Sequence, residues 1–156
     1  MEPITNYVGG CPKTPKDEVF SEVLNPATGE LLGRVPVDGG EGALEAVGAA
    51  SRAFSDWRRT PAGERIQYLF GFKQLLEANF DEIARTITLE NGKTLTESRG
   101  ELRRGIENVE VACGIPTLMQ GYNLEDIAQG IDEIMIRQPL GVVAIITPFN
   151  FPSMIP

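Results

Sequence analysis

The chain has 156 residues, of which 42% are hydrophobic and 23% are charged, a composition typical of a soluble globular protein. Its net charge of −8 argues against nucleic acid as a partner, because phosphate binding needs clustered lysine and arginine. The absence of histidine excludes histidine-based catalysis and histidine metal sites, and two cysteines, Cys11 and Cys113, indicate neither a zinc site nor a disulfide framework.

The start of the chain has neither the pattern of a secretory leader nor that of a transit peptide. No stretch approaches the ~20 apolar residues that a membrane span needs. We therefore predict a cytoplasmic protein without a membrane partner. Residues 1–17 are rich in proline, glycine and polar residues, and they indicate a loop.

A hairpin and four helices are predicted next. Two β-prone runs at residues 19–24 and 30–35 flank the turn sequence NPATG. The four helices have start signals at Asp38 with Glu41, Thr60 with Pro61, Asn79 with Glu82, and Thr94 with Glu97 as a capping box, and stop signals at Asn91-Gly92 and at Gly114 with Pro116. Apolar positions spaced by three and four predict their buried faces: Leu44, Val47, Ser51, Phe54 and Trp57; Ile66, Leu69, Phe72 and Leu76; Ile83 and Ile87; Leu102, Ile106, Val109 and Cys113.

Beyond Pro116 the pattern changes to β-structure. Gly121 and Gly130 bracket a polar stretch, and residues 131–137 indicate a strand. Residues 142–146, VVAII, predict a strand buried on both faces, as in a parallel sheet covered by helices. The sequence TPFNFP at residues 147–152 ends this strand, because two prolines bar its continuation. Ligands of open α/β sheets bind beyond the carboxyl ends of strands, so Asn150 is a candidate functional residue.

The TPFNFP sequence also resembles the Pro-(Trp/Phe)-Asn-(Phe/Tyr)-Pro signature of the aldehyde dehydrogenase superfamily. Within that superfamily, RGIENVE at residues 104–110, LMQG at 118–121 and RQPLGVV at 137–143 resemble the methylmalonate-semialdehyde dehydrogenase branch, which acylates coenzyme A. The resemblance covers roughly residues 20–156. It implies an α/β fold in which an N-terminal hairpin and helices precede the first strand of a Rossmann-like doubly wound sheet, which is incomplete in this chain.

The resemblance also implies a division of the chain and roles for five residues. Residues 1–120 would form the arm, hairpin and helices of the cofactor-binding domain, residues 121–140 a segment of the oligomerisation sheet, and residues 141–156 the first strand and the catalytic turn. Asn150 would donate a hydrogen bond to the substrate oxygen. The alternative is a purely structural role, in which it only caps a turn. The remaining expected roles are contact with the NAD cofactor for Thr147, Pro148 and Phe149, and binding of the substrate carboxylate for Arg104. The alternative for Phe149 is a place in the hydrophobic core.

Simpler interpretations apply to the arginines, to residues 92–94 and to Cys113. Arg103 and Arg104 could instead be solvated, or could pair with a nearby glutamate such as Glu101 or Glu107. Residues 92–94, GKT, are no phosphate-binding loop, because Ile87 stands where such a loop needs glycine and no strand precedes it. Cys113 lies on the apolar stripe of a helix, so we expect a buried side chain and not a nucleophile.

The family's nucleophilic cysteine and its adenosine-binding groups do not occur in these 156 residues. The sequence is therefore interpreted as the N-terminal third of an NAD-dependent enzyme that acts on a small-molecule aldehyde, with coenzyme A as acyl acceptor, in a homo-oligomer (dimer or tetramer). Alone, the chain is expected to be inactive. The alternatives are a hydrolytic relative such as succinate-semialdehyde dehydrogenase, use of NADP, and a non-catalytic assembly or binding module.

Overall fold

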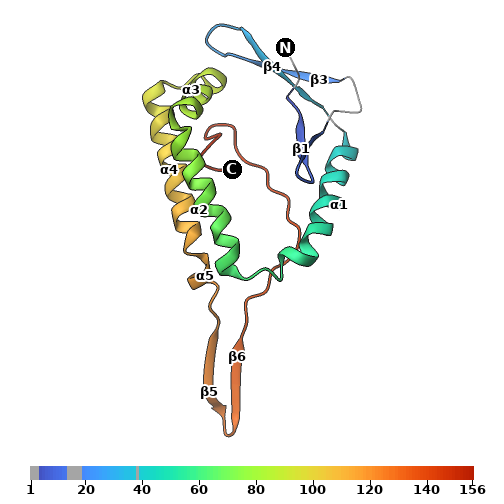
Figure 1. Ribbon diagram of the computed structural model, residues 1–156, viewed down its shortest axis with the longest axis vertical. Coiled ribbons are helices and arrows are strands. Elements are labelled where there is room, and N and C mark those ends of the chain that lie inside the picture. The colour runs from blue at the N-terminus through green and yellow to red at the C-terminus, as the bar shows by residue number, and fades with distance from the viewer. Residues whose placement is uncertain (1–3, 14–18, 38) are drawn as a thin grey trace.

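A computed structural model describes residues 4–13, 19–37 and 39–156. Within these residues the chain forms three separate two-stranded antiparallel sheets and five helices (Figure 1). None of these helices is long and apolar enough to cross a membrane. The elements are, in chain order, β1 (Asn6–Val8), β2 (Cys11–Lys13), β3 (Phe20–Leu24), β4 (Leu31–Pro36), α1 (Gly40–Trp57), α2 (Ala62–Ala78), α3 (Phe80–Asn91), α4 (Leu95–Cys113), α5 (Ile115–Leu118), β5 (Tyr122–Ala128) and β6 (Ile131–Met135).

Two hairpins occupy the first part of the chain. The predicted hairpin is confirmed, because β3 pairs with β4 around a turn at Asn25, whose Oδ1 accepts the N–H of Ala27 at 2.9 Å. The loop prediction for residues 1–17 is wrong in part, since β1 and β2 form a second hairpin. Its turn is Gly9-Gly10, where φ values of 63° and 83° suit glycine and allow a tight reversal.

Of the four predicted helix starts, two differ from the sequence signals, one is confirmed and one lies outside the described residues. Asp38 lies outside the described residues, and Gly39 immediately precedes α1. Thr60 does not cap α2, because Pro61 takes the capping position and the Thr60 hydroxyl donates to the carbonyl oxygen of Asp56. Asn79 precedes α3 as predicted, but its side chain donates back to Leu75 in α2. Only the Thr94 capping box forms as expected.

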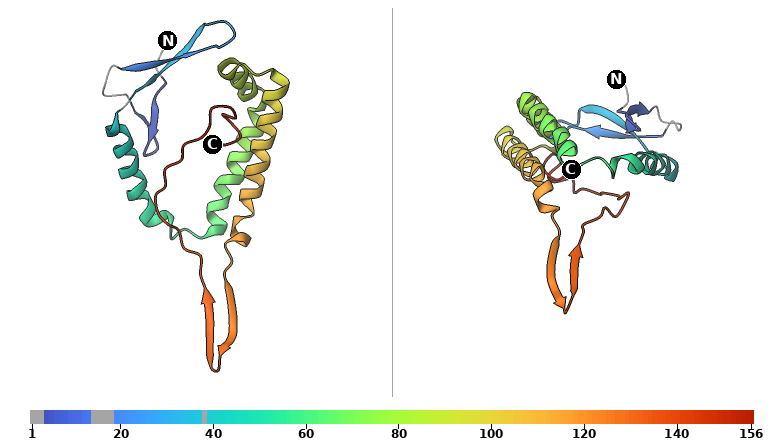
Figure 2. Two further views of the ribbon diagram at one scale, coloured as in Figure 1. Left: turned by 180° about the vertical axis from the view of Figure 1, so that it is seen from behind. Right: turned by 60° about the horizontal axis from the view of Figure 1, so that its bottom comes forward.

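The hydrophobic core is small and lies between α3 and α4. Its fully buried members are Ala84, Ile87, Leu102 and Ile106, and partly buried side chains of Leu76, Phe80, Ile83 and Leu95 pack against it. The predicted buried face of α1 is instead exposed at Leu44, Val47 and Trp57. The reason is its position, because α1 packs against β1 and lies across the molecule from α2 to α4 (Figures 1 and 2). Cys113 is half-buried, so its predicted burial is only partly met.

The strand predicted over residues 131–137 is confirmed as β6, which pairs with β5. β5 was missed, because its polar sequence YNLEDIA lacks the apolar run that marks a buried strand. Gly130, with φ of 73°, forms the turn between the two strands. The β5–β6 hairpin projects away from the helices (Figures 1 and 2). Its expected part in joining subunits stays a prediction.

Residues 142–146 do not form the predicted buried strand. They run without hydrogen-bonded strand partners, and Ile146 is 98% exposed. A strand needs a neighbour to satisfy its N–H and C=O groups, and no other described segment pairs with this one. The run does not coil into a helix either. By itself the chain therefore leaves this apolar segment open, as the expectation of an incomplete sheet implies.

Candidate functional site

The site begins at the corner between α3 and α4. Gly92 ends α3 in the left-handed conformation, with φ of 82°, and a Cβ there would stand 2.9 Å from Cγ of Pro26. Thr94 then begins α4: its Oγ1 accepts the N–H of Glu97 at 3.3 Å, and the Glu97 carboxylate accepts the N–H of Thr94 at 3.1 Å. Lys93 lies between the C-terminal end of α3 and the N-terminal cap of α4, and both of these features hold its neighbouring backbone in place.

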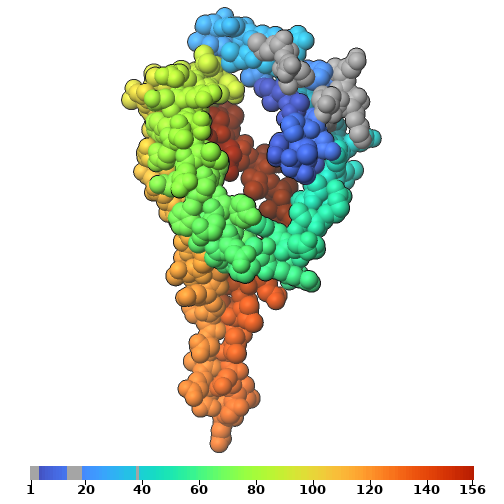
Figure 3. Space-filling view, viewed as in Figure 1, coloured from blue at the N-terminus to red at the C-terminus, as the bar shows by residue number. Residues whose placement is uncertain are grey.

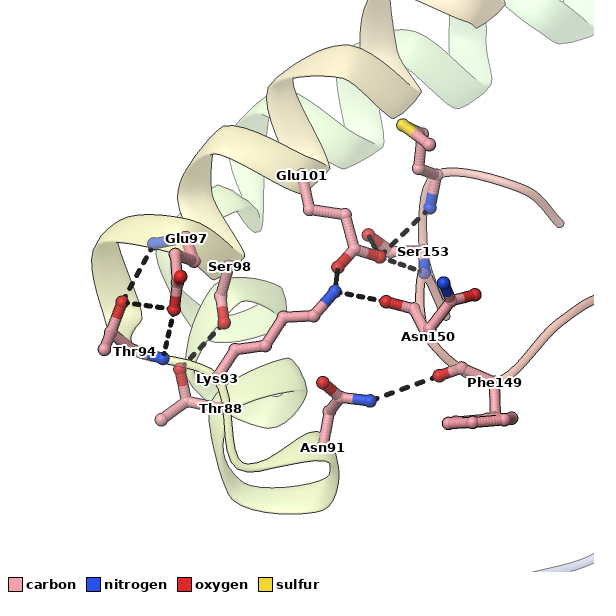
Figure 4. A network of polar contacts seen from close by, with 11 residues as sticks. Thr88, Asn91, Lys93, Thr94, Glu97, Ser98, Glu101, Phe149, Asn150 and Ser153 are labelled. Carbon is pink, nitrogen blue, oxygen red and sulfur yellow. Dashed lines mark hydrogen bonds and ion pairs between the residues drawn. The ribbon is translucent and has the colours of Figure 1, made fainter.

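A buried carboxylate lies two turns into α4. Glu101 belongs to the buried stripe of the helix and is 1% exposed. One of its oxygens accepts from Nζ of Lys93, and the other accepts the N–H groups of Ser153 at 2.8 Å and Met154 at 3.3 Å and the hydroxyl of Ser153 at 3.2 Å (Figure 4). Glu101 therefore joins α4 to a turn at residues 149–154.

The surroundings of Glu101 keep it ionised. Burial raises its pKa, but the hydrogen bond from Lys93, the hydrogen bond from the Ser153 backbone and the positive charge of Lys93 together lower it by more. The pKa of this carboxyl therefore lies below its ordinary value. A buried charge of this kind is tolerated only where a counter-charge and hydrogen bonds replace water, and Glu101 has both.

Further contacts attach the 149–154 turn to α3 and α4. Nζ of Lys93 donates to the carbonyl oxygen of Asn150 at 2.5 Å, and Nδ2 of Asn91 donates to the carbonyl oxygen of Phe149 at 3.1 Å (Figure 4). Nδ2 of Asn108 donates to the carbonyl oxygen of Met154 at 3.3 Å. Gly105 permits the close approach, because a Cβ there would stand 3.0 Å from the carbonyl oxygen of Ser153. The backbone of the turn is thus bound at both ends.

Asn150 occupies the exposed part of this turn. Its carbonyl oxygen is bound by Lys93, whereas its side-chain amide makes no hydrogen bond to another residue that the structure describes. It lines a shallow surface pocket together with Phe149, Asn91 and Pro26. The space-filling view shows this last part of the chain lying in the opening between α2 and the β1 hairpin (Figure 3). The amide is therefore free to donate to a ligand.

The three residues predicted to contact the cofactor lie just before Asn150. Thr147 is half-buried, Pro148 is exposed, and the Phe149 side chain is 88% exposed, so the alternative that Phe149 belongs to the core is wrong for this chain. This apolar surface fits contact with a flat ring such as nicotinamide. All three directly precede Asn150 in the chain, and their cofactor role stays a prediction.

The two adjacent arginines of α4 have different surroundings. Arg103 forms a bidentate pair with Glu77 of α2, at 2.7 and 3.1 Å, so the alternative of pairing with a glutamate is confirmed, although the partner is neither Glu101 nor Glu107. Arg104 lies with its guanidinium carbon 5.2 Å from the centre of the Phe151 ring. No carboxylate pairs with Arg104 in the part of the chain that the structure covers. Its side chain lines a surface pocket with Lys93, Glu97, Gly100 and Phe151.

Sequence reasoning missed Asn91, Lys93, Glu101 and Ser153 as parts of this site. Lys93 was considered only within a rejected phosphate loop, and Glu101 only as a partner for arginine. One signal was available for Glu101, because it stands beside Leu102 and one turn before Gly105 on the buried face of α4. A charged residue on a buried stripe requires a partner, and that requirement predicts a polar contact.

The chain is similar to known proteins over nearly its whole length. The model of the aldehyde dehydrogenase family matches residues 13–156. Malonate-semialdehyde dehydrogenase 2 of Geobacillus kaustophilus (strain HTA426) is 50% identical over 100% of this chain, which spans 32% of that protein. The chain therefore spans about a third of the length of the curated relatives that it matches.

Solved structures also resemble the chain over nearly its whole length. The crystal structure of methylmalonate-semialdehyde dehydrogenase from Oceanimonas doudoroffii has a TM-score of 0.93 and 44% identity, and the match covers 99% of this chain and 31% of that one. A structure from Sinorhizobium meliloti 1021, in complex with NAD, has a TM-score of 0.90 and 37% identity, with 95% and 30% of the two chains covered.

Proposed function

The chain belongs to the aldehyde dehydrogenase family, and on that premise we propose that it is one segment of a longer NAD-dependent dehydrogenase that converts malonate or methylmalonate semialdehyde to an acyl-coenzyme A. The names of the relatives support the substrate, and the NAD complex of one similar structure supports the cofactor. Because the chain spans about a third of its relatives, the complete protein supplies the remaining groups.

In the proposed reaction, Asn150 acts on the substrate oxygen. A cysteine thiolate from outside this chain adds to the aldehyde carbon, and the bonding electron pair moves to the oxygen, which becomes negatively charged. The Asn150 amide N–H donates a hydrogen bond to that oxygen. Such a donor stabilises the transition state by roughly 3–4 kcal/mol, because it is directed at charge that develops there.

The other predicted residues bind and orient the reactants. A nicotinamide dinucleotide, when bound, would supply the acceptor for the hydride of the substrate carbon. Thr147, Pro148 and Phe149 form the apolar surface against which its ring packs. Arg104 binds the carboxylate at the far end of the semialdehyde, because a guanidinium group matches a carboxylate with two parallel hydrogen bonds. The thiol of coenzyme A then displaces the cysteine sulfur from the enzyme-bound thioester.

The observation that carries this proposal is the free Asn150 amide on a turn whose backbone is bound by Asn91, Lys93 and Glu101. The test is turnover of the complete protein with malonate and methylmalonate semialdehydes, NAD and coenzyme A, with products identified by mass spectrometry. We expect acyl-coenzyme A, and we expect Asn150→Ala to lower kcat by about 10²–10³-fold without loss of the fold. Unchanged turnover in that variant would remove Asn150 from the mechanism.

Two alternatives give different results in the same experiments. A hydrolytic relative, for example one specific for succinate semialdehyde, would release the free acid even with coenzyme A present. A non-catalytic binding or assembly module would be found in cells with the 17.0 kDa mass of this chain and would turn over no aldehyde. Expressed alone, the chain is expected to be inactive, because the cysteine of the proposed mechanism comes from elsewhere.

A further inference from the structure

We propose that Lys93 and Asn91 are positioning residues that direct the Asn150 amide toward the substrate oxygen, with Glu101 as the buried group that fixes Lys93. The proposal rests on the proposed function of Asn150. It concerns three side chains that act through the backbone of Asn150 and its turn, and it assigns them a role in the rate of the chemical step.

The geometry follows from the two peptide planes on either side of Asn150. Peptide bonds are planar, so the direction of the Cα–Cβ bond depends on the φ and ψ angles between adjacent planes. The carbonyl oxygen of Phe149 belongs to the preceding plane and accepts from Asn91 at 3.1 Å. The carbonyl oxygen of Asn150 belongs to the following plane and accepts from Lys93 at 2.5 Å. With both planes bound, the direction in which the Asn150 side chain leaves the backbone is fixed.

Lys93 can act in this way only because its own side chain is immobilised. A lysine has a flexible four-carbon stem and usually samples many rotamers at a surface. Here the ammonium group is bound by Glu101 and lies 4.4 Å from the centre of the Phe151 ring, and the side chain is 19% exposed. Glu101 also accepts the N–H groups of Ser153 and Met154, so one carboxylate fixes both the lysine and the far end of the turn.

The test uses the complete enzyme with Lys93→Met, which keeps most of the stem and removes the ammonium group. A displacement of about 1 Å in a catalytic group costs on the order of 10²-fold in rate, so we expect kcat to fall by about 10–100-fold with KM nearly unchanged. Lys73→Met is the matched control. It removes another lysine paired with α4, through Glu110 at 3.0 Å, but Lys73 has no contact with the 149–154 turn among the interactions of the described residues. We expect its kcat to stay close to that of the parent enzyme.

A double-mutant cycle separates positioning from general stability. If Lys93 acts through Asn150, adding Lys93→Met to Asn150→Ala produces less than about a twofold further loss of kcat. Losses that multiply would show an independent effect and overturn the proposal. Unchanged kcat in Lys93→Met and Asn91→Ala, with a large loss in Asn150→Ala, would overturn positioning alone. Unchanged kcat in Asn150→Ala would overturn both the proposed function of that residue and this inference.

Two further variants keep the test decisive if Lys93→Met, which leaves Glu101 charged and unpaired, does not fold. The double variant Lys93→Met, Glu101→Gln removes both charges while it keeps the shape of the pair. Asn91→Ala removes the other donor and leaves no buried charge alone. We expect both to lower kcat and to show the same lack of additivity with Asn150→Ala. Full turnover in both folded variants would contradict the proposal.

Discussion

The carboxylate of Glu101 accepts the backbone N–H of Ser153 at 2.8 Å, across 52 residues of sequence. This contact attaches the turn that carries Asn150 to the middle of α4. The turn is therefore held by helices, although the residues that lead into it have the sequence of a strand. The geometry around Asn150 therefore depends on the stability and position of α3 and α4.

Acidification is expected to weaken the attachment of the turn. The pKa of Glu101 in the folded protein lies below its ordinary value, so its ionisation stabilises the fold at pH values above that ordinary value. This contribution is lost as pH falls through the lowered pKa. Thermal unfolding of the complete protein at neutral and acidic pH measures the effect. Glu101→Gln should show a smaller decrease in its unfolding midpoint on acidification than the parent protein, and an equal decrease would contradict the assignment.

Loss of the Thr94 hydroxyl should destabilise the corner between α3 and α4. Thr94→Ala removes the acceptor for the N–H of Glu97 and is expected to cost about 1 kcal/mol of unfolding free energy. Thr60→Ala is the matched control, because the Thr60 hydroxyl caps no helix and only donates to the carbonyl oxygen of Asp56. Denaturant unfolding of the two variants should rank Thr94→Ala as the less stable one, and the opposite ranking would show that the capping box contributes little.

A methyl group at Gly105 should displace the 149–154 turn. The added Cβ would stand 3.0 Å from the carbonyl oxygen of Ser153 and 3.3 Å from Cα of Met154, which are backbone atoms that can give way only if the turn moves. Gly105→Ala is therefore expected to lower both kcat and stability. Gly71→Ala in α2 is the control, since a Cβ there meets nothing within 4 Å, and it should raise stability by roughly 0.5–1 kcal/mol. Unchanged kcat in Gly105→Ala would mean that the turn tolerates displacement.

Arg104 is expected to recognise the charged end of the substrate. Arg104→Leu should raise KM for malonate semialdehyde by about tenfold or more, because a charge-assisted hydrogen bond contributes roughly 1.5–3 kcal/mol. KM for propanal, which has no carboxylate, should change little. Arg103→Leu breaks the pair with Glu77 and should lower stability without this difference between substrates. An equal rise in KM for both aldehydes would exclude carboxylate binding by Arg104.

The local features of the fold could be predicted from sequence, because their signals lie within a few residues. The capping box at Thr94 and Glu97 and the left-handed stop at Gly92 depend on neighbouring backbone groups alone. Thr60 misled the prediction, since Pro61 takes the capping position itself. Helical periodicity marked an apolar face on α1 correctly, but a periodic pattern does not say which segment covers that face, and here none of its residues is buried.

Of the candidate site, only the segment that carries Asn150 could be predicted from the sequence. TPFNFP at residues 147–152 singled out Asn150 through its own residue types. The contacts that hold it join residues 46 to 58 positions apart, as between Asn108 and Met154 or Asn91 and Phe149. Periodicity relates only residues that are near in sequence, so it does not predict contacts over such distances. The apolar run at residues 142–146 predicted a buried strand, and that strand does not form. The position of Glu101 beside Leu102 of the predicted apolar stripe is the one local sign of the attachment in the sequence.

The position of the anchoring residues also has a consequence for the order of events during synthesis. Asn91, Lys93 and Glu101 leave the ribosome well before the turn that they bind, and α3 and α4 form through contacts between near neighbours in the chain, which is the rapid class of folding. The turn can therefore dock on finished helices as soon as it leaves the ribosome. A nascent chain would then acquire the geometry around Asn150 before any strand pairs with residues 142–146.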